Sequence, residues 1–150
     1  MRAVNVRTAR PSDYDQLARV IDAWWGRPIQ QGLPRLFLDH FWRTSLVAEE
    51  KQGELVGFLV GLLSPSDALM AYVHFAAVAP EERRCGLATV LYDRFFDLAR
   101  ANGRITVRAI TSPQNEQSIA FHRRLRFEVS PPVPDYNGPG TAAVEMERAL

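Results

Sequence analysis

Two neighbouring segments that are apolar at almost every position limit most strongly what this chain can fold into. They are "ELVGFLVGLL", Glu54 to Leu63, and "AYVHFAAVA", Ala71 to Ala79. A strand that is apolar at both its odd and its even positions is typical of the centre of a sheet, where both faces are covered. Both segments are far shorter than the ~20 residues of a membrane-spanning helix. We therefore expect two central strands and no membrane partner.

The segments around these two predict the first half of the fold. "SLVAEE", Ser45 to Glu50, precedes them, and the turn signals "KQG" and "SPSD" separate the three, which is typical of an antiparallel meander. An alternating strand is predicted at Val4 to Thr8. A helix is predicted from Ser12 or Asp13, both good N-cap residues, and a short second helix between Arg35 and Thr44.

The sequence pattern from Leu87 onward predicts alternating helices and strands. A helical stripe begins at Leu87 and ends at Asn102-Gly103, and the strand "RITVRAIT", Arg104 to Thr111, follows it. A helix between two strands favours a parallel pair joined by a right-handed crossover. Another helix (Asn115 to Leu125), the strand "FEVS" and a terminal strand "AVEMER" complete the pattern. We expect an α/β (α+β) fold with a central mixed sheet of about seven strands and about four helices.

Composition is that of an ordinary soluble domain. The chain has 150 residues, 47% hydrophobic and 23% charged, with a net charge of +1, so we expect a single domain over residues 1–150. The arginines are scattered, which argues against nucleic acid as a partner. The single cysteine, Cys85, and the lack of a signal-type apolar region at the N-terminus favour a cytoplasmic protein. We expect no metal site.

The stretch "RRCGLA", Arg83 to Ala88, lies between a predicted strand and a predicted helix. The first N–H groups of a helix need acceptors, and the positive end of the helix dipole favours an anion there. Gly86 would let a phosphate approach, and Arg83 and Arg84 could add charge-assisted hydrogen bonds. The stretch matches neither "GxGxxG" nor "GxxxxGK[ST]". On these residues alone, an anion site and an ordinary basic helix start are equally open.

The chain here resembles the GNAT family, the GCN5-related N-acetyltransferases. "RRCGLA" matches the family pattern Q/R-x-x-G-x-G/A, and "NEQSIAFHRRLRF", Asn115 to Phe127, resembles the second pattern, N-x-x-S/A-x-x-F/L-Y-x-x-x-G-F. The preceding strand, "YVHFAAVAP", and the order of elements extend the resemblance over nearly the whole chain.

The resemblance implies an acetyl-CoA (coenzyme A) site. In the family, loop amides hold the cofactor pyrophosphate, and a strand and a later helix flank the pantetheine arm. The cofactor residues implied here are Ala76, Val78, Arg83, Arg84, Cys85, Gly86, Leu87, Ala88, Thr89, Asn115 and Ser118. The implied activity is transfer of an acetyl group to a primary amine by direct attack in a ternary complex.

Three residues are candidates for proton transfer. The tyrosine that commonly protonates the departing thiolate in the family aligns with His122, which would have to be protonated first; water is the alternative donor. Strand alternation places Tyr72, His74, Ala76 and Val78 on one face. Tyr72 matches a family glutamate base, but His74 is the better base, and a buried structural histidine is the alternative. Arg126 stands where the family has glycine, which predicts a strained turn or a different one.

The acceptor side is the least constrained part of the site. Trp25, Arg27, Asp135 and Tyr136 lie in segments that wall the acceptor in the family, and an aromatic wall with a carboxylate suits a cationic amine. The acceptor could be a small molecule or a protein amine. Two other functions stay open: a non-catalytic coenzyme A-binding regulatory domain and a small interaction module. A homodimer is possible.

Overall fold

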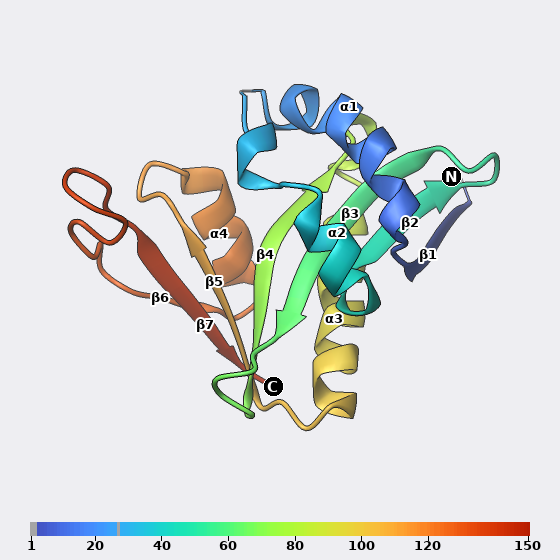
Figure 1. Ribbon diagram of the computed structural model, residues 1–150. Coiled ribbons are helices and arrows are strands. Elements are labelled where there is room, and N and C mark those ends of the chain that lie inside the picture. Colours follow the sequence, from blue (N-terminus) through green and yellow to red (C-terminus); the bar gives the residue numbers. More distant parts are fainter. Residues whose placement is uncertain (1–2, 27) are drawn as a thin grey trace. The chain divides into compact units, whose positions relative to one another are not determined.

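The computed structural model describes residues 3–26 and 28–150 (Figure 1). The strands are β1 (Val4–Thr8), β2 (Leu46–Glu50), β3 (Leu55–Leu63), β4 (Met70–Val78), β5 (Thr106–Thr111), β6 (Glu128–Val129) and β7 (Val144–Ala149). The helices are α1 (Tyr14–Trp25), α2 (Leu36–Phe41), α3 (Leu87–Ala101) and α4 (Glu116–Arg124). Short 3₁₀ turns include η2 (Gln30–Gly32) and η4 (Pro80–Glu82).

The strands form one hydrogen-bonded sheet in the order β1-β2-β3-β4-β5-β7-β6. β1, β2 and β3 pair antiparallel, and β4 pairs parallel with β5. These findings confirm the predicted mixed sheet of seven strands, the antiparallel pairing of the first two strands of the meander, and the parallel pairing of the strands on either side of α3. The chain divides into a first unit, residues 1–62 and 73–98, and a second unit, residues 63–72 and 99–150. The expectation of a single domain stays a prediction.

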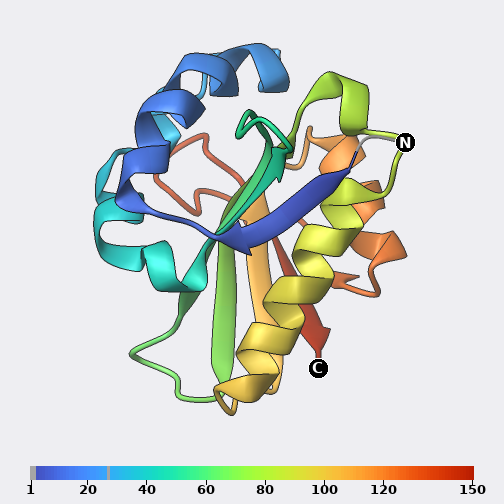
Figure 2. The same cartoon turned by 90° about the vertical axis from the view of Figure 1, so that its right-hand side faces the viewer.

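In the first unit, α1 and α2 cover one face of the strands and α3 covers the other (Figure 2). All seven residues from Leu55 to Gly61 are buried, which confirms β3 as a central strand. Alternation explains how both faces pack. Phe58 meets the Trp24 ring of α1 at a centroid distance of 6.3 Å. Gly57 and Gly61 face α3, where leucine and phenylalanine side chains fill the space that glycine leaves.

The start of α1 differs from the predicted N-cap. Asp13 occupies the cap position, but its side chain makes no cap hydrogen bond into α1. It turns back instead, accepts the Arg10 N–H at 2.7 Å and pairs with Arg7 at 2.9 and 3.0 Å. Arg7 also lies 3.1 Å from the Glu49 carboxylate. A half-buried arginine between two carboxylates thus outcompetes the cap hydrogen bond.

In the second unit, β7 pairs antiparallel with β5 from Val144 to Ala149 and with the short β6. The buried side of β5 carries Val107 and Ala109, while Arg108 points outward toward Glu147 at 3.3 Å. Asn115 caps α4: its Oδ1 accepts the Ser118 N–H at 3.3 Å. None of the helices in residues 3–26 and 28–150 is long and apolar enough to span a bilayer.

Candidate active site

The loop before α3 presents unpaired amides. Pro80–Glu82 forms the 3₁₀ turn η4, and Gly86 (φ 76°) turns the chain into α3. The Gly86 carbonyl accepts the Val90 N–H at 3.1 Å, which starts the helix. Among the described residues, no acceptor is present for the amides of Arg84, Gly86, Leu87, Ala88 and Thr89. This is the unsatisfied N–H cluster expected of a helix start.

Two details of this loop differ from the sequence-based expectation. The Cys85 N–H is not available, because it donates to the Glu82 carbonyl at 3.2 Å. A Cβ added at Gly86 would meet nothing within 4 Å. Glycine is therefore favoured here by its left-handed φ rather than by lack of space. Cys85 and Arg84 are both exposed.

Arg83 is oriented away from the loop amides, toward α1. Its guanidinium donates a hydrogen bond to the carbonyl oxygen of Trp24, in the last turn of α1. Carbonyls in the last turn of a helix lack internal partners and lie at the negative end of its dipole. The side chain of Arg83 therefore satisfies the end of α1 and ties it to the cofactor loop.

The side-chain alternation predicted for β4 is wrong at its C-terminal end. Val78 lies on the α3 side: a Cβ at Gly57 would be 3.3 Å from Val78 Cγ1 and from leucine carbons of α3. His74 faces the opposite side, where its ring stacks on Phe37 of α2. Phe75 also reaches that side, 4.9 Å from the Trp25 ring. Two consecutive side chains on one face break the period of two, as bulged strands do beside active sites.

His74 is held by two contacts on the α2 side. Its Nε2 lies 2.8 Å from the Gly32 carbonyl oxygen, and its ring centroid lies 4.0 Å from that of Phe37, with 15° between the planes. A carbonyl oxygen only accepts, so Nε2 carries the proton and donates it. Burial lowers the pKa of His74 below 6.5, although the Gly32 hydrogen bond opposes the shift. The imidazole of His74 is therefore neutral, and its Nδ1 is the basic nitrogen.

Tyr72 remains a phenol over the physiological pH range. Burial raises its pKa to about 12, with a further contribution from Tyr136. A phenol with such a pKa is a poor base at neutral pH and can only donate or accept hydrogen bonds. Of the two base candidates on β4, His74 therefore has the suitable ionisation state.

His122 is buried at the end of α4. Its Nδ1 donates to the Ser118 carbonyl oxygen at 2.7 Å, with Ser118 Oγ at 3.3 Å, and its ring meets Phe127 edge-on at 5.0 Å. Burial lowers its pKa below 6.5, although the Ser118 hydrogen bond opposes the shift. The protonated form of His122, which a proton donor to the thiolate would need, is therefore disfavoured.

The loop before β7 is organised by Asp135, which has a left-handed backbone (φ 53°). Its Oδ1 accepts the Gly140 N–H at 2.8 Å, and its carbonyl accepts the Gly138 N–H at 3.1 Å. The adjacent Tyr136 is exposed. Asp135 therefore has a structural role whether or not it binds an amine. Arg27, the other charged residue predicted on the acceptor side, lies outside the described residues.

Comparison with known proteins decides the family. The model of the acetyltransferase (GNAT) family matches residues 14–127. The chain belongs to this family. The L-methionine sulfoximine/L-methionine sulfone acetyltransferase of Pseudomonas paraeruginosa (strain DSM 24068 / PA7) is 32% identical over 114 residues, which are 75% of this chain and 60% of that protein. The chain spans 40–60% of the length of the curated relatives that it matches.

Solved GNAT structures confirm the fold. Ard1 from Thermoplasma volcanium superposes with a TM-score of 0.82 at 25% identity, over 99% of this chain and 98% of that chain. The diaminobutyrate acetyltransferase EctA from Paenibacillus lautus, in complex with L-2,4-diaminobutyric acid and coenzyme A, gives a TM-score of 0.73 at 19% identity. It covers 97% of this chain and 95% of that chain.

Arg126 stands where the GNAT pattern has glycine, and the turn at this position is the same as the one glycine would make. Arg126 adopts the left-handed conformation (φ 68°) expected of the family glycine. The Arg126 N–H donates to Arg123 O at 2.9 Å, and the Phe127 N–H donates to His122 O at 2.9 Å. Together these form a Schellman cap of α4 with arginine at the position that glycine usually occupies. The turn is retained, and arginine bears the strain.

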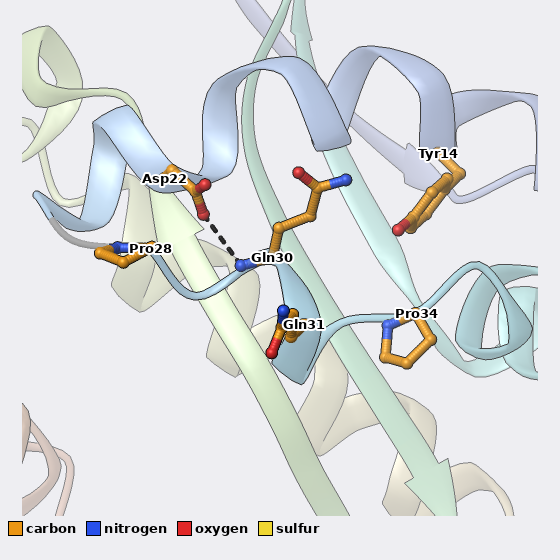
Figure 3. A pocket seen from close by; sticks show the side chains of 6 residues that line it. All are labelled: Tyr14, Asp22, Pro28, Gln30, Gln31 and Pro34. Carbon is orange, nitrogen blue, oxygen red and sulfur yellow. Dashed lines mark hydrogen bonds between the residues drawn. The ribbon is translucent and has the colours of Figure 1, made fainter.

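Sequence reasoning missed several parts of this GNAT site. The contacts of Gly32 and Phe37 with His74 were not predicted, because both residues lie far from it in sequence and carry no motif. It also missed a cavity of about 550 Å³ beside α1 (Figure 3). Its lining residues are Tyr14, Asp22, Pro28, Gln30, Gln31 and Pro34. No motif marks these residues, because three separated segments bring them together.

Proposed function

We propose that this GNAT chain is an N-acetyltransferase that moves the acetyl group of acetyl-CoA to a primary amine in a ternary complex. The observation that carries the proposal is the group of five unpaired amides at the start of α3, at Arg84 and at Gly86 to Thr89. Such amides, at the positive end of a 15-residue helix, suit a pyrophosphate. EctA, of the same fold, is crystallised with coenzyme A. Backbone groups of Ala76 and Val78 would pair with the pantetheine arm.

His74 is the proposed general base. Its Nε2–H is committed to the Gly32 carbonyl, so its Nδ1 lone pair can take a proton from the acceptor ammonium. Acetyl-CoA would supply the acetyl group as an activated thioester. The free amine then forms its bond to the acetyl carbon as the carbon–sulfur bond breaks, and the second proton that the nitrogen loses passes through water to the departing thiolate. The stacked ring of Phe37 fixes the plane of the imidazole, which keeps the base oriented.

Water is the proposed proton donor to the departing thiolate. Burial disfavours the imidazolium form of His122, and its Nδ1 proton is held by the Ser118 carbonyl. A thiolate whose conjugate acid has a pKa near 8.5 is stable enough near neutral pH to leave without prior protonation, and solvent can protonate it afterwards, so no buried acid is needed. His122 would then stabilise the end of α4, while Tyr72 would act only as a hydrogen-bond donor.

The acceptor proposed for the first tests is a small amino acid with a second functional group. Two curated relatives are named for L-2,4-diaminobutyric acid and for L-methionine sulfoximine/L-methionine sulfone, whereas one solved structure of the same fold is named for a protein acceptor, the alanine of ribosomal protein S18. The half-buried Trp25 and the carboxylate of Asp135 are of the types that bind a cationic amine. A protein N-terminus is the competing class of acceptor. Location in the cytoplasm, self-association and cofactor contacts by Asn115 and Ser118 stay predictions.

A pair of glycine variants tests the proposal. Gly86→Val and Gly103→Val replace glycines of nearly equal φ, 76° and 74°, both with open space around a new Cβ. Both should lose similar stability, because a β-branched residue disfavours positive φ. Only Gly86→Val should weaken coenzyme A binding in calorimetry, by about tenfold or more, because only Gly86 belongs to the amide group.

Turnover is tested separately, by thiol release from acetyl-CoA with an amine panel. The panel contains L-methionine sulfoximine, L-2,4-diaminobutyric acid and a peptide with a free N-terminus. Thiol release with any of them supports the enzyme. Coenzyme A binding without turnover on a broad amine panel would favour a regulatory domain, and no binding at all would overturn the proposal.

A further inference from the structure

Arg83 connects the cofactor loop to α1 within the first unit. Its side chain donates to the Trp24 carbonyl, and 59 positions separate the two residues in the sequence. A charged donor at the C-terminal end of a helix is favourable for both the lone carbonyl and the helix dipole. Arg83 and its neighbour Arg84 are both exposed, but the Arg84 side chain makes no hydrogen bond or ion pair in the described part of the chain.

The same last turns of α1 hold the segment that follows. Asp22, two positions before Trp24, accepts the N–H groups of Ile29 and Gln30 at 2.8 Å each through its Oδ1. Figure 3 shows the second of these hydrogen bonds. These two amides lead directly into η2, Gln30–Gly32. A carboxylate that accepts two backbone amides fixes a turn more firmly than a neutral acceptor does.

η2 ends at the group that orients His74. The Gly32 carbonyl accepts from His74 Nε2 at 2.8 Å, and a Cβ at Gly32 would touch only Phe75, at 3.8 Å. Three hydrogen-bonded contacts, joined by the short backbone segments of α1 and η2, therefore connect Arg83 to the end of α1, Asp22 to η2, and Gly32 to His74. Each step joins a charged or polar side chain to a backbone group that it positions.

We propose that Arg83 and Asp22 are positioning residues for the acceptor amine and its base, rather than ligands of the cofactor. The sequence predicts the opposite for Arg83, a side chain that adds charge-assisted hydrogen bonds to a phosphate. The inference rests on the proposed function, because the base it positions is the one proposed above. According to this inference, Arg83, the arginine of the cofactor motif, helps to position the acceptor amine and its base.

Steady-state kinetics with matched arginine variants separates the two roles. Arg83→Met removes the donor but keeps most of the stem, and should raise the KM of the amine about tenfold, because the end of α1 and η2 are then held less firmly on the acceptor side. Its dissociation constant for coenzyme A should stay within about twofold of wild type, a difference too small to represent a lost phosphate contact. Arg83→Lys keeps a charged donor, so its amine KM should lie between that of wild type and that of Arg83→Met. Arg94→Met, an exposed change on α3, controls for charge.

Hydrogen exchange gives a readout that needs no substrate. The Ile29 and Gln30 amides should exchange faster in Arg83→Met and in Asp22→Ala than in wild type, by more than any change in melting temperature explains. Arg94→Met should leave both amides as they are. If Arg83→Met does not fold, Arg83→Lys and Asp22→Asn, which weaken the same contacts more gently, are compared by the same exchange measurement.

The outcomes distinguish this inference from the proposed function. Weaker coenzyme A binding by Arg83→Met, with unchanged amine KM and unchanged exchange at Ile29 and Gln30, would overturn the inference and leave the acetyltransferase intact. Failure of the wild-type protein to turn over any amine would contradict the proposed function instead. The exchange experiment would still decide whether Arg83 holds α1 and η2.

Discussion

The ring of Phe95 on α3 occupies the space that a side chain at Gly61 on β3 would need. A Cβ added at Gly61 would lie 2.2 Å from Cε1 of Phe95, and Phe95 is fully buried. The helix and the strand therefore pack in direct contact at this point. Helix α3 carries the amides proposed to bind the cofactor. The contact between Phe95 and Gly61 therefore fixes the position of this helix on the sheet.

Gly61→Ala should lower the free energy of unfolding by about 2–3 kcal/mol, because an overpacked core forces the backbone or Phe95 to move. Gly57→Ala, where the nearest contacts are 3.3 Å, should cost less, about 1 kcal/mol. Urea unfolding measures both. In a double-mutant cycle, Phe95→Leu should recover part of the loss at Gly61. Equal costs at Gly57 and Gly61 would contradict the packing described here.

Arg126→Gly should raise the free energy of unfolding by about 1 kcal/mol, because a left-handed arginine costs about 1–2 kcal/mol and glycine adopts this conformation freely. Thermal or urea unfolding measures the change. Arg123→Gly, inside α4, is the matched control and should destabilise by about 1 kcal/mol. A destabilising effect of Arg126→Gly would indicate that its side chain contributes more than the strain costs.

The pH dependence of turnover should identify His74 as the base. Because its pKa lies below 6.5, kcat/KM should be maintained near neutral pH and should fall as the pH drops through that lowered value and Nδ1 becomes protonated. His74→Ala should remove this limb and lower kcat about 100-fold or more. His122→Phe should keep both the limb and most of kcat, since burial already keeps His122 neutral. A normal pH profile in His74→Ala would reject the assignment.

Two substitutions separate the structural role of Asp135 from a role in binding the amine. Asp135→Asn keeps an acceptor for the Gly140 N–H and tolerates the left-handed backbone, but removes the charge. Its amine KM should rise about tenfold while stability stays near wild type, consistent with one lost contact to a cation. Asp135→Ala should also lose about 1 kcal/mol of stability, from the lost hydrogen bond. An unchanged amine KM in Asp135→Asn would place the acceptor charge elsewhere.

Much of the fold could be predicted because it depends on local patterns. Each of three signals is contained in a short stretch of sequence: the continuous apolar run of β3, the helical stripe that begins at Leu87, and the helix end at Gly103. The cofactor loop was predictable for the same reason, since Gly86 and the start of α3 are adjacent in sequence. The cap residue Asn115 also acts within its own first turn.

The contacts that define the chemistry could not be predicted, because they join distant segments. Forty-two positions separate His74 from Gly32. Side-chain alternation placed Val78 beside His74, but the break in β4 reverses the face between them, and periodicity cannot locate such a break. The ionisation of His122 depends on burial by Phe127 and on the Ser118 carbonyl, which the sequence alone does not specify.

A titration of the ¹⁵N-labelled protein with coenzyme A, followed by amide NMR, tests the central claim most directly. We predict that the amides of Arg84, Gly86, Leu87, Ala88 and Thr89 shift together as the cofactor saturates, and that the Cys85 amide, already bonded to Glu82, shifts less. Saturable coenzyme A binding that leaves these five amides unchanged would contradict the account.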